Sequence, residues 1–472
     1  MTPPYSHLAA QHLQEGLAFL DRQMLKSPSV NDQIGFDFQG LRRSFQENPR
    51  HPDSKMVAHF GRIWIYDIAL AIYADLKAGR LRQASYQAGR LMQLALKEEE
   101  KGFKGFLHFS YNTREDTFID ARGPTGANAW CLNALYAYIL KSGDASLLKW
   151  TNRVTRDWLF SRQVLDPPDS RYGLIRAGLH NADEAARGEA MGYQVYEGDL
   201  NSPYEHVILE HCADAAGTFR LAYRATRRLF PGESRFLEEL IHRHDLLMRG
   251  VRRRFWQEDH FVTALDAAGQ LCKGTDGQPS VAVDNNTWSA HVFLPYDLDL
   301  ARKAIRYVEE RFALQAPPGA VEDVEDGADP TGLKGVYYFP SSFWDPFVEV
   351  PAEHRAKMER IFQPEAAYGF AVFLFSASDS LAESEEGEGL RRRAWEIYEN
   401  AVRLQRLYGP SGAPYASANV PAVFSTLHSV TTAATSVIVS AILQGSPADD
   451  FIGVLPPLEF TVEGRPPLKH AS

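Results

Sequence analysis

Two kinds of helical segment alternate along the chain, one apolar on nearly every side and the other apolar on one side only. Residues 364–379 contain two charged side chains, Glu365 and Asp379, whereas residues 385–408 contain ten. A helix that is apolar all round is enclosed by protein, while a helix with a single apolar stripe faces solvent on its other side. The alternation therefore predicts an inner set of helices covered by an outer set.

The pattern predicts twelve helices. We expect the inner helices at residues 60–78, 126–142, 205–229, 284–294, 364–379 and 424–443. We expect the outer helices at residues 6–25, 82–100, 145–164, 233–256, 297–313 and 385–408. Six such alternations predict an all-α fold, an (α/α)6 barrel in which the hairpins close into a ring. Short β pieces, such as residues 106–112 and 335–343, are expected on its rim.

The chain contains no linker at which it would divide into domains. A chain of 472 residues would normally split, because single cores rarely grow that large. A closed ring escapes this limit, since each hairpin packs mainly on its neighbours. We predict a single catalytic toroid over residues 1–455 and a C-terminal tail over residues 456–472.

Charge and cysteine content narrow the classes of partner and compartment. A net charge of −10 argues against nucleic acid or an anionic membrane as partner. The three cysteines show no CxxC spacing and cannot form a disulfide framework. The N-terminus lacks the features of a signal peptide, and the Ser, Thr and His side chains in residues 424–443 make membrane insertion costly. We predict a cytoplasmic protein, and its oligomeric state stays open.

Polar and aromatic residues collect just ahead of the apolar segments. These joints are residues 59–67, 120–130, 201–207, 283–291, 362–370 and 419–428. If the inner helices run in one direction, the joints meet at one end of the ring and line a single cavity. The acidic residues at the joints are Asp67, Asp120, Asp199, Glu205, Asp284 and Glu365.

Several joints resemble those of the six-hairpin glycosidase superfamily, in particular its bacterial polysaccharide-hydrolase-like members. The matching motifs are GPTGANAWCLNALYAYILKSGD (123–144), SPYEH (202–206), DNNTW (284–288) and PEAAYGF (364–370). The resemblance covers about residues 1–450 and implies an (α/α)6 toroid with a carbohydrate ligand. The same toroid hosts glycosidases, epimerases, lyases and noncatalytic relatives, so the resemblance leaves the reaction open.

Glycoside hydrolysis needs two carboxyl groups, an acid that protonates the leaving oxygen and a base or nucleophile on the other side. We predict Glu205 as the acid, because it opens an apolar helix, and Asp120 as the base, because Arg122 would keep it ionised. Glu365 and Asp284 are the substitutes. Each has a structural alternative: a helix-dipole partner for Glu205 and Glu365, an ion-pair partner for Asp120, and an N-cap for Asp284.

Sugar rings stack on flat aromatic side chains, and their hydroxyl groups bind amides and carboxylates. The predicted substrate-binding residues at the joints are Trp64, Tyr66, Arg122, Asn128, Trp130, Tyr204, His206, Asn285, Trp288, Tyr368 and His428. The alternative is that the aromatic rings pack the interior of the toroid. That alternative fits Tyr136 and Tyr138 and stays open for Trp130 and Trp288.

No metal or cofactor is predicted. His206 and His211 are five residues apart and do not share a helix face, unlike the two histidines of a zinc-binding HExxH motif. The acidic loop at residues 322–327 lacks the alternating ligands of an EF-hand. The glycine-rich stretch at residues 123–126 lacks the Lys-Ser/Thr ending of a phosphate-binding P-loop.

The leading hypothesis is a glycoside hydrolase that cleaves an oligo- or polysaccharide with two carboxylates, inversion being favoured. One alternative is a sugar epimerase, an isomerase or a polysaccharide lyase that uses His206, His291 or His428 as base, since proton abstraction beside a carbonyl suits a base near neutral pH. Another alternative is a noncatalytic carbohydrate-binding toroid.

Overall fold

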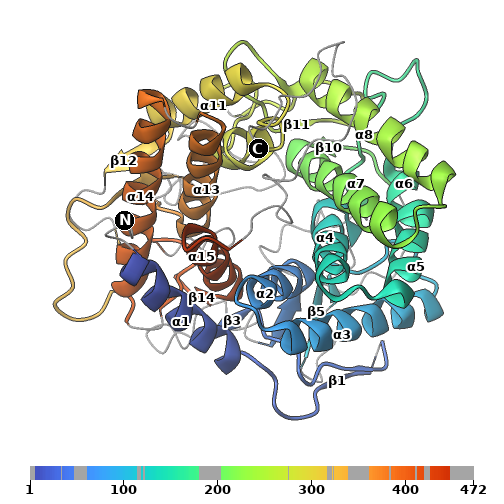
Figure 1. Cartoon of the computed structure of the whole chain (residues 1–472), viewed down its shortest axis with the longest axis horizontal. Coiled ribbons are helices and arrows are strands. Elements are labelled where there is room, and N and C mark those ends of the chain that lie inside the picture. The colour runs from blue at the N-terminus through green and yellow to red at the C-terminus, as the bar shows by residue number, and fades with distance from the viewer. Residues whose placement is uncertain are drawn as a thin grey trace.

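The helices form two concentric rings around one axis in the computed structural model of the chain (Figure 1). The structure describes residues 6–32, 34–46, 61–113, 119–120, 123–179, 203–274, 276–315, 321–322, 324–337, 361–381, 384–409, 412–418 and 426–446. The inner ring consists of α2 (Ile65–Lys77), α4 (Thr125–Ser142), α7 (Leu209–Leu229), α9 (Val283–Asn286) with α10 (Trp288–His291), α13 (Pro364–Ser380) and α15 (Val430–Leu443). Each inner helix packs on the next and α15 packs on α2, so the ring is closed. The predicted (α/α)6 barrel is confirmed.

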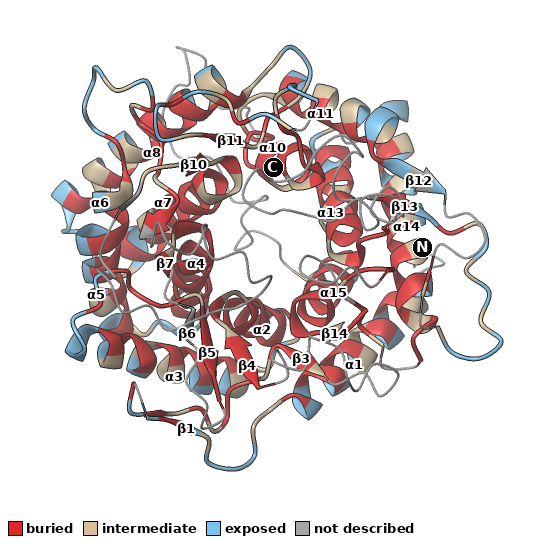
Figure 2. Ribbon diagram, turned by 180° about the vertical axis from the view of Figure 1, so that it is seen from behind, coloured by how far each residue is buried: buried red, intermediate tan, exposed pale blue. Residues whose placement is uncertain are grey.

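The outer ring covers the inner one. Its helices are α1 (Ser6–Arg22), α3 (Leu81–Glu100), α5 (Ala145–Val154), α8 (Ser234–Phe255), α11 (Leu298–Arg311) and α14 (Glu385–Arg406), with α5 continuing through the π-helical turn η2 (Thr155–Leu159) into α6 (Phe160–Arg162). The inner helices are buried almost throughout, whereas the outer helices expose one side (Figure 2). This is the burial that the alternating hydrophobic pattern predicts.

Short strands lie at the joints, and several inner helices therefore begin later than predicted. The strands ahead of inner helices are β4 (Arg62–Trp64), β7 (Gly123–Pro124), β10 (Val207–Ile208) and β14 (His428–Ser429). β4 pairs with β5 (Ser110–Asn112), which also pairs with β6 (Ile119–Asp120), and β7 pairs with β8 (Gly178–Leu179), which also pairs with β9 (Pro203–Tyr204). β10 pairs with β11 (Ala264–Leu265), and β14 pairs with β3 (Phe45–Gln46). Backbone groups at the joints pair with strands from other parts of the chain instead of entering the helix.

The remaining strands form two hairpins at the edge of the ring. They are β1 (Val30–Asn31) with β2 (Phe36–Asp37), and β12 (Ala313–Gln315) with β13 (Lys334–Val336). The predicted rim pieces are confirmed at Ser110–Asn112 and Lys334–Val336, and residues 338–343 lie outside the described part.

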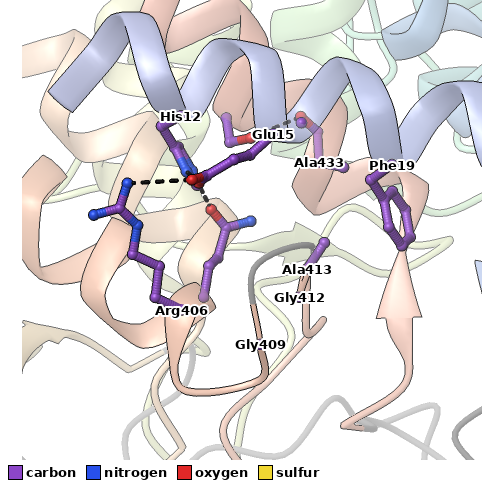
Figure 3. Close-up of a pocket in the computed structure, with 11 residues that line it drawn as sticks. His12, Glu15, Phe19, Arg406, Gly409, Gly412, Ala413 and Ala433 are labelled. Carbon is purple, nitrogen blue, oxygen red and sulfur yellow. Dashed lines mark hydrogen bonds and ion pairs between the residues drawn. The ribbon is translucent and has the colours of Figure 1, made fainter. Parts of the chain in front are cut away.

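A buried polar network joins the first helix to the last hairpins at the seam of the ring. His12 Nε2 lies 3.0 Å from the hydroxyl of Tyr368, and both groups contact the side-chain oxygen of Gln405. Glu15 continues the network, 3.2 Å from His12 Nδ1 and 3.4 Å from a guanidinium nitrogen of Arg406 (Figure 3). These residues border a cavity of about 10 Å³, which has room for about one water molecule. The network thus ties α1 to α13 and α14.

The place of Tyr368 in this network argues against its predicted contact with a substrate. Its side chain is fully buried, and its hydroxyl is occupied by His12 and Gln405.

Among the described helices, none is both long and apolar enough to cross a membrane. The last described helix ends at Leu443, and residues 447–472, including the predicted tail, lie outside the described part. The domain boundary at residue 455 therefore stays a prediction.

A glycine allows α1 to approach α15 closely at the seam. A Cβ atom on Gly16 would lie 2.6 Å from Cγ2 of Val437 and 3.3 Å from the carbonyl oxygen of Ala433. The Gly16→Val substitution should lower the free energy of unfolding by about 1–3 kcal/mol, because the added side chain overpacks the crossing. Chemical denaturation measures the change.

Gly89 provides a matched control within another outer helix. A Cβ atom on Gly89 meets no other heavy atom within 4 Å. Gly89→Val should therefore change stability by about 0.5 kcal/mol or less. Equal denaturation midpoints for the two variants would contradict the close crossing.

Candidate active site

Four inner helices carry an acidic residue in their first turn. These residues are Asp67 on α2, Glu210 on α7, Asp284 on α9 and Glu365 on α13. The charges of Asp284, Glu210 and Asp67 all raise the pKa of Glu365, so the four carboxyl groups lie within electrostatic reach of one another. The amino-terminal ends of these helices therefore meet at one end of the ring, as the joints predict.

Asp214 lies one helical turn beyond Glu210 on α7, so the two carboxyl groups share a helix face. Burial is the main cause that raises the pKa of both groups, to about 7 for Glu210 and well above its usual range for Asp214. The charge of Glu210 adds to the shift of Asp214. This pair therefore favours a shared proton near neutral pH.

Glu365 combines a raised pKa with a partly exposed side chain. Burial raises its pKa well above the usual range, and the charge of Asp284 is the next largest cause. The hydroxyl of Tyr66 donates a hydrogen bond of 3.1 Å to its Oε1, which offsets part of the shift. The side chain is partly exposed. Glu365 is thus a carboxylic acid that favours its protonated form and can reach a ligand.

Asp67 connects α2 to α15. Burial raises its pKa to about 7, and hydrogen bonds from Ser44 and Thr431 offset part of the shift. The hydroxyl of Thr431 donates to Oδ1 of Asp67. Because the side chain is only 3% exposed, Asp67 acts on Glu365 through its charge and does not reach a ligand by contact.

Two tryptophans stack beside the carboxyl groups. The rings of Trp130 and Trp288 are 5.0 Å apart at 20°, and Tyr66 meets Trp130 edge-on at 5.5 Å. The indole nitrogen of Trp288 donates a 3.0 Å hydrogen bond to Oδ1 of Asp214. Trp130 is 2% exposed and supports the stack from behind, while Trp288 is partly exposed.

Gly126 allows α7 to approach α4 at this point. A Cβ atom there would lie 2.3 Å from Cδ2 of His211 and 3.1 Å from Oδ2 of Asp214. The space beside this glycine is therefore occupied by side chains of α7.

The sequence matches no protein-family model and no curated protein. A solved D-mannose isomerase matches with 11% identity over 94% of this chain and 99% of its own, at a TM-score of 0.60. Cellobiose 2-epimerase from Bacillus thermoamylovorans B4167 matches with 9% identity over 92% and 98%, at a TM-score of 0.58. Cellobiose 2-epimerase from Spirochaeta thermophila DSM 6192 matches with 15% identity over 93% and 96%, at a TM-score of 0.55.

The chain has the six-hairpin toroid fold. At these identities the likeness concerns the fold alone, so the function of this six-hairpin toroid has to be argued from its own residues.

Glu205 does not open an inner helix of the toroid as predicted. It precedes β10, four residues ahead of α7, and the first-turn acid of that helix is Glu210. Its Oε2 lies 2.8 Å from Nε of Arg176 and 3.1 Å from a guanidinium nitrogen of Arg171. Two arginines thus occupy this carboxyl group as ion-pair partners, which argues against the predicted role of general acid.

Two predicted amides hold the toroid's joints together. The side chain of Asn128 donates to the carbonyl oxygens of Leu107 and Pro124 and accepts from the backbone of Leu107. Asn285 accepts from Thr263 at 2.7 Å and from the backbone nitrogen of Ala282. Both side chains are buried, so these contacts argue against direct binding of a substrate. Ala282, and not Asp284, is the N-cap residue of α9.

Other predicted residues lie at the rim or outside the described part. Trp64 packs against Phe109 with ring centroids 4.6 Å apart. Asp120 pairs through its backbone with Ser110, and Tyr204 lies in β9, but their side chains lie outside the described part. Asp199 and Arg122 also lie outside it. Their predicted roles stay predictions.

The histidines predicted as bases are poorly suited to that task. Burial lowers the pKa of His291 to about 3 and that of His428 to about 4, and it also lowers the pKa of His206. A base with so low a pKa abstracts protons weakly at neutral pH. His211, which no sequence argument selected, lies against Gly126 beside the carboxyl groups.

Glu210 and Asp214 were also missed by sequence reasoning. Their spacing of four residues at the start of an apolar helix was the available signal, but it depends on knowing that the helix starts at Leu209. Within the described ranges, no three His, Cys, Asp or Glu side chains are grouped to hold a metal ion.

The pKa of Asp67 predicts a pH-dependent stability. The group has a pKa of 3.8 in an ordinary setting and about 7 in the folded protein, so the folded chain keeps a proton that the unfolded chain releases. Asp67 therefore contributes its full stability to the folded chain below pH 4, and this contribution is lost as the pH rises to about 7. Asp67→Asn should therefore gain stability relative to the native chain over this range, by up to about 4 kcal/mol.

Urea denaturation at several pH values measures this gain. Asp144, which caps α5 through the backbone nitrogens of Ser146 and Leu147, is the control because these bonds lower its pKa. Asp144→Asn should show the opposite trend with pH. A constant stability difference between Asp67→Asn and the native chain would rule out a buried, titrating Asp67.

Proposed function

We propose that this protein is a glycoside hydrolase in which Glu365 is the general acid and Asp284 is the general base. The observation that carries the proposal is that the two carboxyl groups lie on neighbouring helices, close enough that the charge of Asp284 is the largest charge effect that raises the pKa of Glu365. Paired carboxyl groups with separated pKa values divide the work of acid and base. Both residues lie in first turns, on the packed helices α9 and α13.

The reaction follows from these roles. Protonated Glu365 donates its proton to the glycosidic oxygen as the bond from that oxygen to the anomeric carbon breaks. Ionised Asp284 accepts a proton from the water that attacks this carbon. Inversion requires the two carboxyl groups to stand on opposite sides of the sugar, roughly 6.5–9.5 Å apart. Trp288 supplies a flat, partly exposed ring for the sugar.

Variants at the two carboxyl groups test the assignment. Glu365→Gln should lower kcat on natural oligosaccharides by about 10²–10⁴-fold, because the leaving oxygen is no longer protonated. The same variant should retain activity on glycosyl fluorides, since fluoride leaves without an acid. Asp284→Asn should lose activity on both kinds of substrate. Product analysis by mass spectrometry over a panel of oligosaccharides measures the rates.

Glu205→Gln is the matched comparison, because it changes a carboxylate that is paired with arginines at the rim. It should reduce the rate far less than Glu365→Gln. If instead Glu205→Gln abolishes hydrolysis of oligosaccharides but retains activity on glycosyl fluorides, Glu205 is the acid. The pair of Glu205 and Asp120 then replaces the pair proposed here. Binding of the panel without turnover by the native chain would favour a noncatalytic toroid.

A second candidate is a sugar isomerase or 2-epimerase. It is supported by the activities named for the D-mannose isomerase and the cellobiose 2-epimerases of like fold, and by the position of His211 at the carboxyl cluster. Such an enzyme would remove the proton at C2 of the sugar with a base.

Deuterium exchange distinguishes the two reactions. In D2O, an isomerase or epimerase should introduce deuterium at C2 of D-mannose or cellobiose, whereas a hydrolase should not. If the second candidate is right, His211→Asn should abolish the exchange and His206→Asn should reduce it far less, because the pKa of His206 is lowered and it lies near Arg171. An absence of exchange with the native chain excludes this candidate.

A further inference from the structure

The stacked tryptophans are held from a third helix by one buried carboxyl group. Oδ1 of Asp214 accepts the hydrogen bond from the indole nitrogen of Trp288 at 3.0 Å. The ring of Trp130 stacks on that of Trp288, with the ring centroids 5.0 Å apart, and the indole group of Trp130 lowers the pKa of Asp214. One carboxyl group on α7 thus engages one tryptophan from α4 and one from α10.

The backbone around Trp288 does little to orient its ring. Trp288 begins α10, which has only four residues, and Thr287 separates α10 from the equally short α9 with φ −111° and ψ −73°. The other inner helices that contribute to the site are longer and continuous. A side chain at such a break depends on tertiary contacts for its orientation, and for Trp288 these include the ring of Trp130 and the carboxyl group of Asp214.

Asp214 is itself held firmly. It is 1% exposed and lies in the second turn of the continuous helix α7. Its Oδ2 would be 3.1 Å from a Cβ atom on Gly126, so the missing side chain of that glycine admits the carboxyl group close to α4. The acceptor therefore occupies a defined position between two helices.

We propose that Asp214 is a positioning residue that fixes Trp288, through its indole nitrogen, as the flat platform on which a sugar ring stacks. The inference rests on the proposed function, because it takes the cavity to be a carbohydrate site. Asp214 acts through Trp288 and not on the substrate, since its side chain is only 1% exposed and its Oδ1 accepts the hydrogen bond from Trp288. A sugar bound to a fixed ring loses less freedom on binding than one that must order the ring first.

Substitutions of Asp214 separate this role from catalysis. Asp214→Asn keeps an oxygen acceptor for the indole nitrogen, whereas Asp214→Leu removes it at similar volume. We expect Asp214→Leu to raise KM about tenfold or more with kcat changed only a few-fold, and Asp214→Asn to restore KM close to the native value. Where no substrate is turned over, the dissociation constants of cellobiose, maltose and mannobiose, from quenching of tryptophan fluorescence, take the place of KM.

A spectroscopic signature reports the platform without any ligand. Two indole rings stacked at 5.0 Å give an exciton couplet in circular dichroism, and the difference between the native chain and Trp130→Phe assigns it. We expect Asp214→Leu to lose the couplet and Asp214→Asn to keep it. Glu210→Gln, one turn away on the same helix face, removes a carboxylate of the same cluster and should also keep it.

The outcomes separate the alternatives. A couplet that persists in Asp214→Leu, or a native KM in that variant, overturns the proposal. A fall in kcat of about 10³-fold in Asp214→Asn with the couplet intact would make Asp214 an acid or base instead. If Asp214→Leu does not fold, Trp288→Phe, which keeps a ring without the donor, should raise KM in the same way, and a native KM there also overturns it. If Asp214→Leu loses the couplet but the native chain binds no sugar, the proposed function is rejected, while the contact between Asp214 and Trp288 is supported.

Discussion

Helices that are apolar on every side must be surrounded by protein, and this requirement shapes the whole molecule. The inner helices satisfy it by packing on one another in a closed ring and by taking an outer helix over their remaining side. Closure requires the first helix to meet the last hairpins. The network of His12, Tyr368 and Gln405 forms this contact, and its buried polar groups bind one another. Beside it, α1 crosses α15 closely because Gly16 has no side chain.

The same ring creates an unusual electrostatic setting at one end. Helix amino termini favour negative charge, whereas burial among apolar side chains disfavours it. Both effects act on Asp67, Glu210, Asp284 and Glu365, which lie in first turns that converge. Mutual repulsion and desolvation together favour a mixture of protonated and ionised groups. Such a mixture is the condition for acid and base chemistry in one cavity near neutral pH.

Short strands at the joints decide which residues reach that cavity. Pairing of β10 with β11 moves the start of α7 to Leu209, so Glu205 remains at the rim with Arg171 and Arg176, and Glu210 takes the first turn. The paired strands are only two or three residues long and join segments far apart in the chain. No local pattern in the sequence marks them, because their backbone hydrogen bonds depend on the partner and not on the side chains.

The sequence by itself determined the two alternating kinds of helix and the end at which the joints meet, whereas the single helix predicted at residues 284–294 is divided at Thr287 into α9 and α10. Helix period and apolar character are local properties of the sequence. The helix predicted at residues 364–379 is accordingly confirmed as α13. Only the tertiary structure decided which carboxyl groups lie together, and that Asn128, Asn285 and Tyr368 bind other parts of the protein. Asp214 shows the reason. Its partner Trp288 lies 74 residues away, and a contact across that distance depends on how helices pack and not on the residues that flank it.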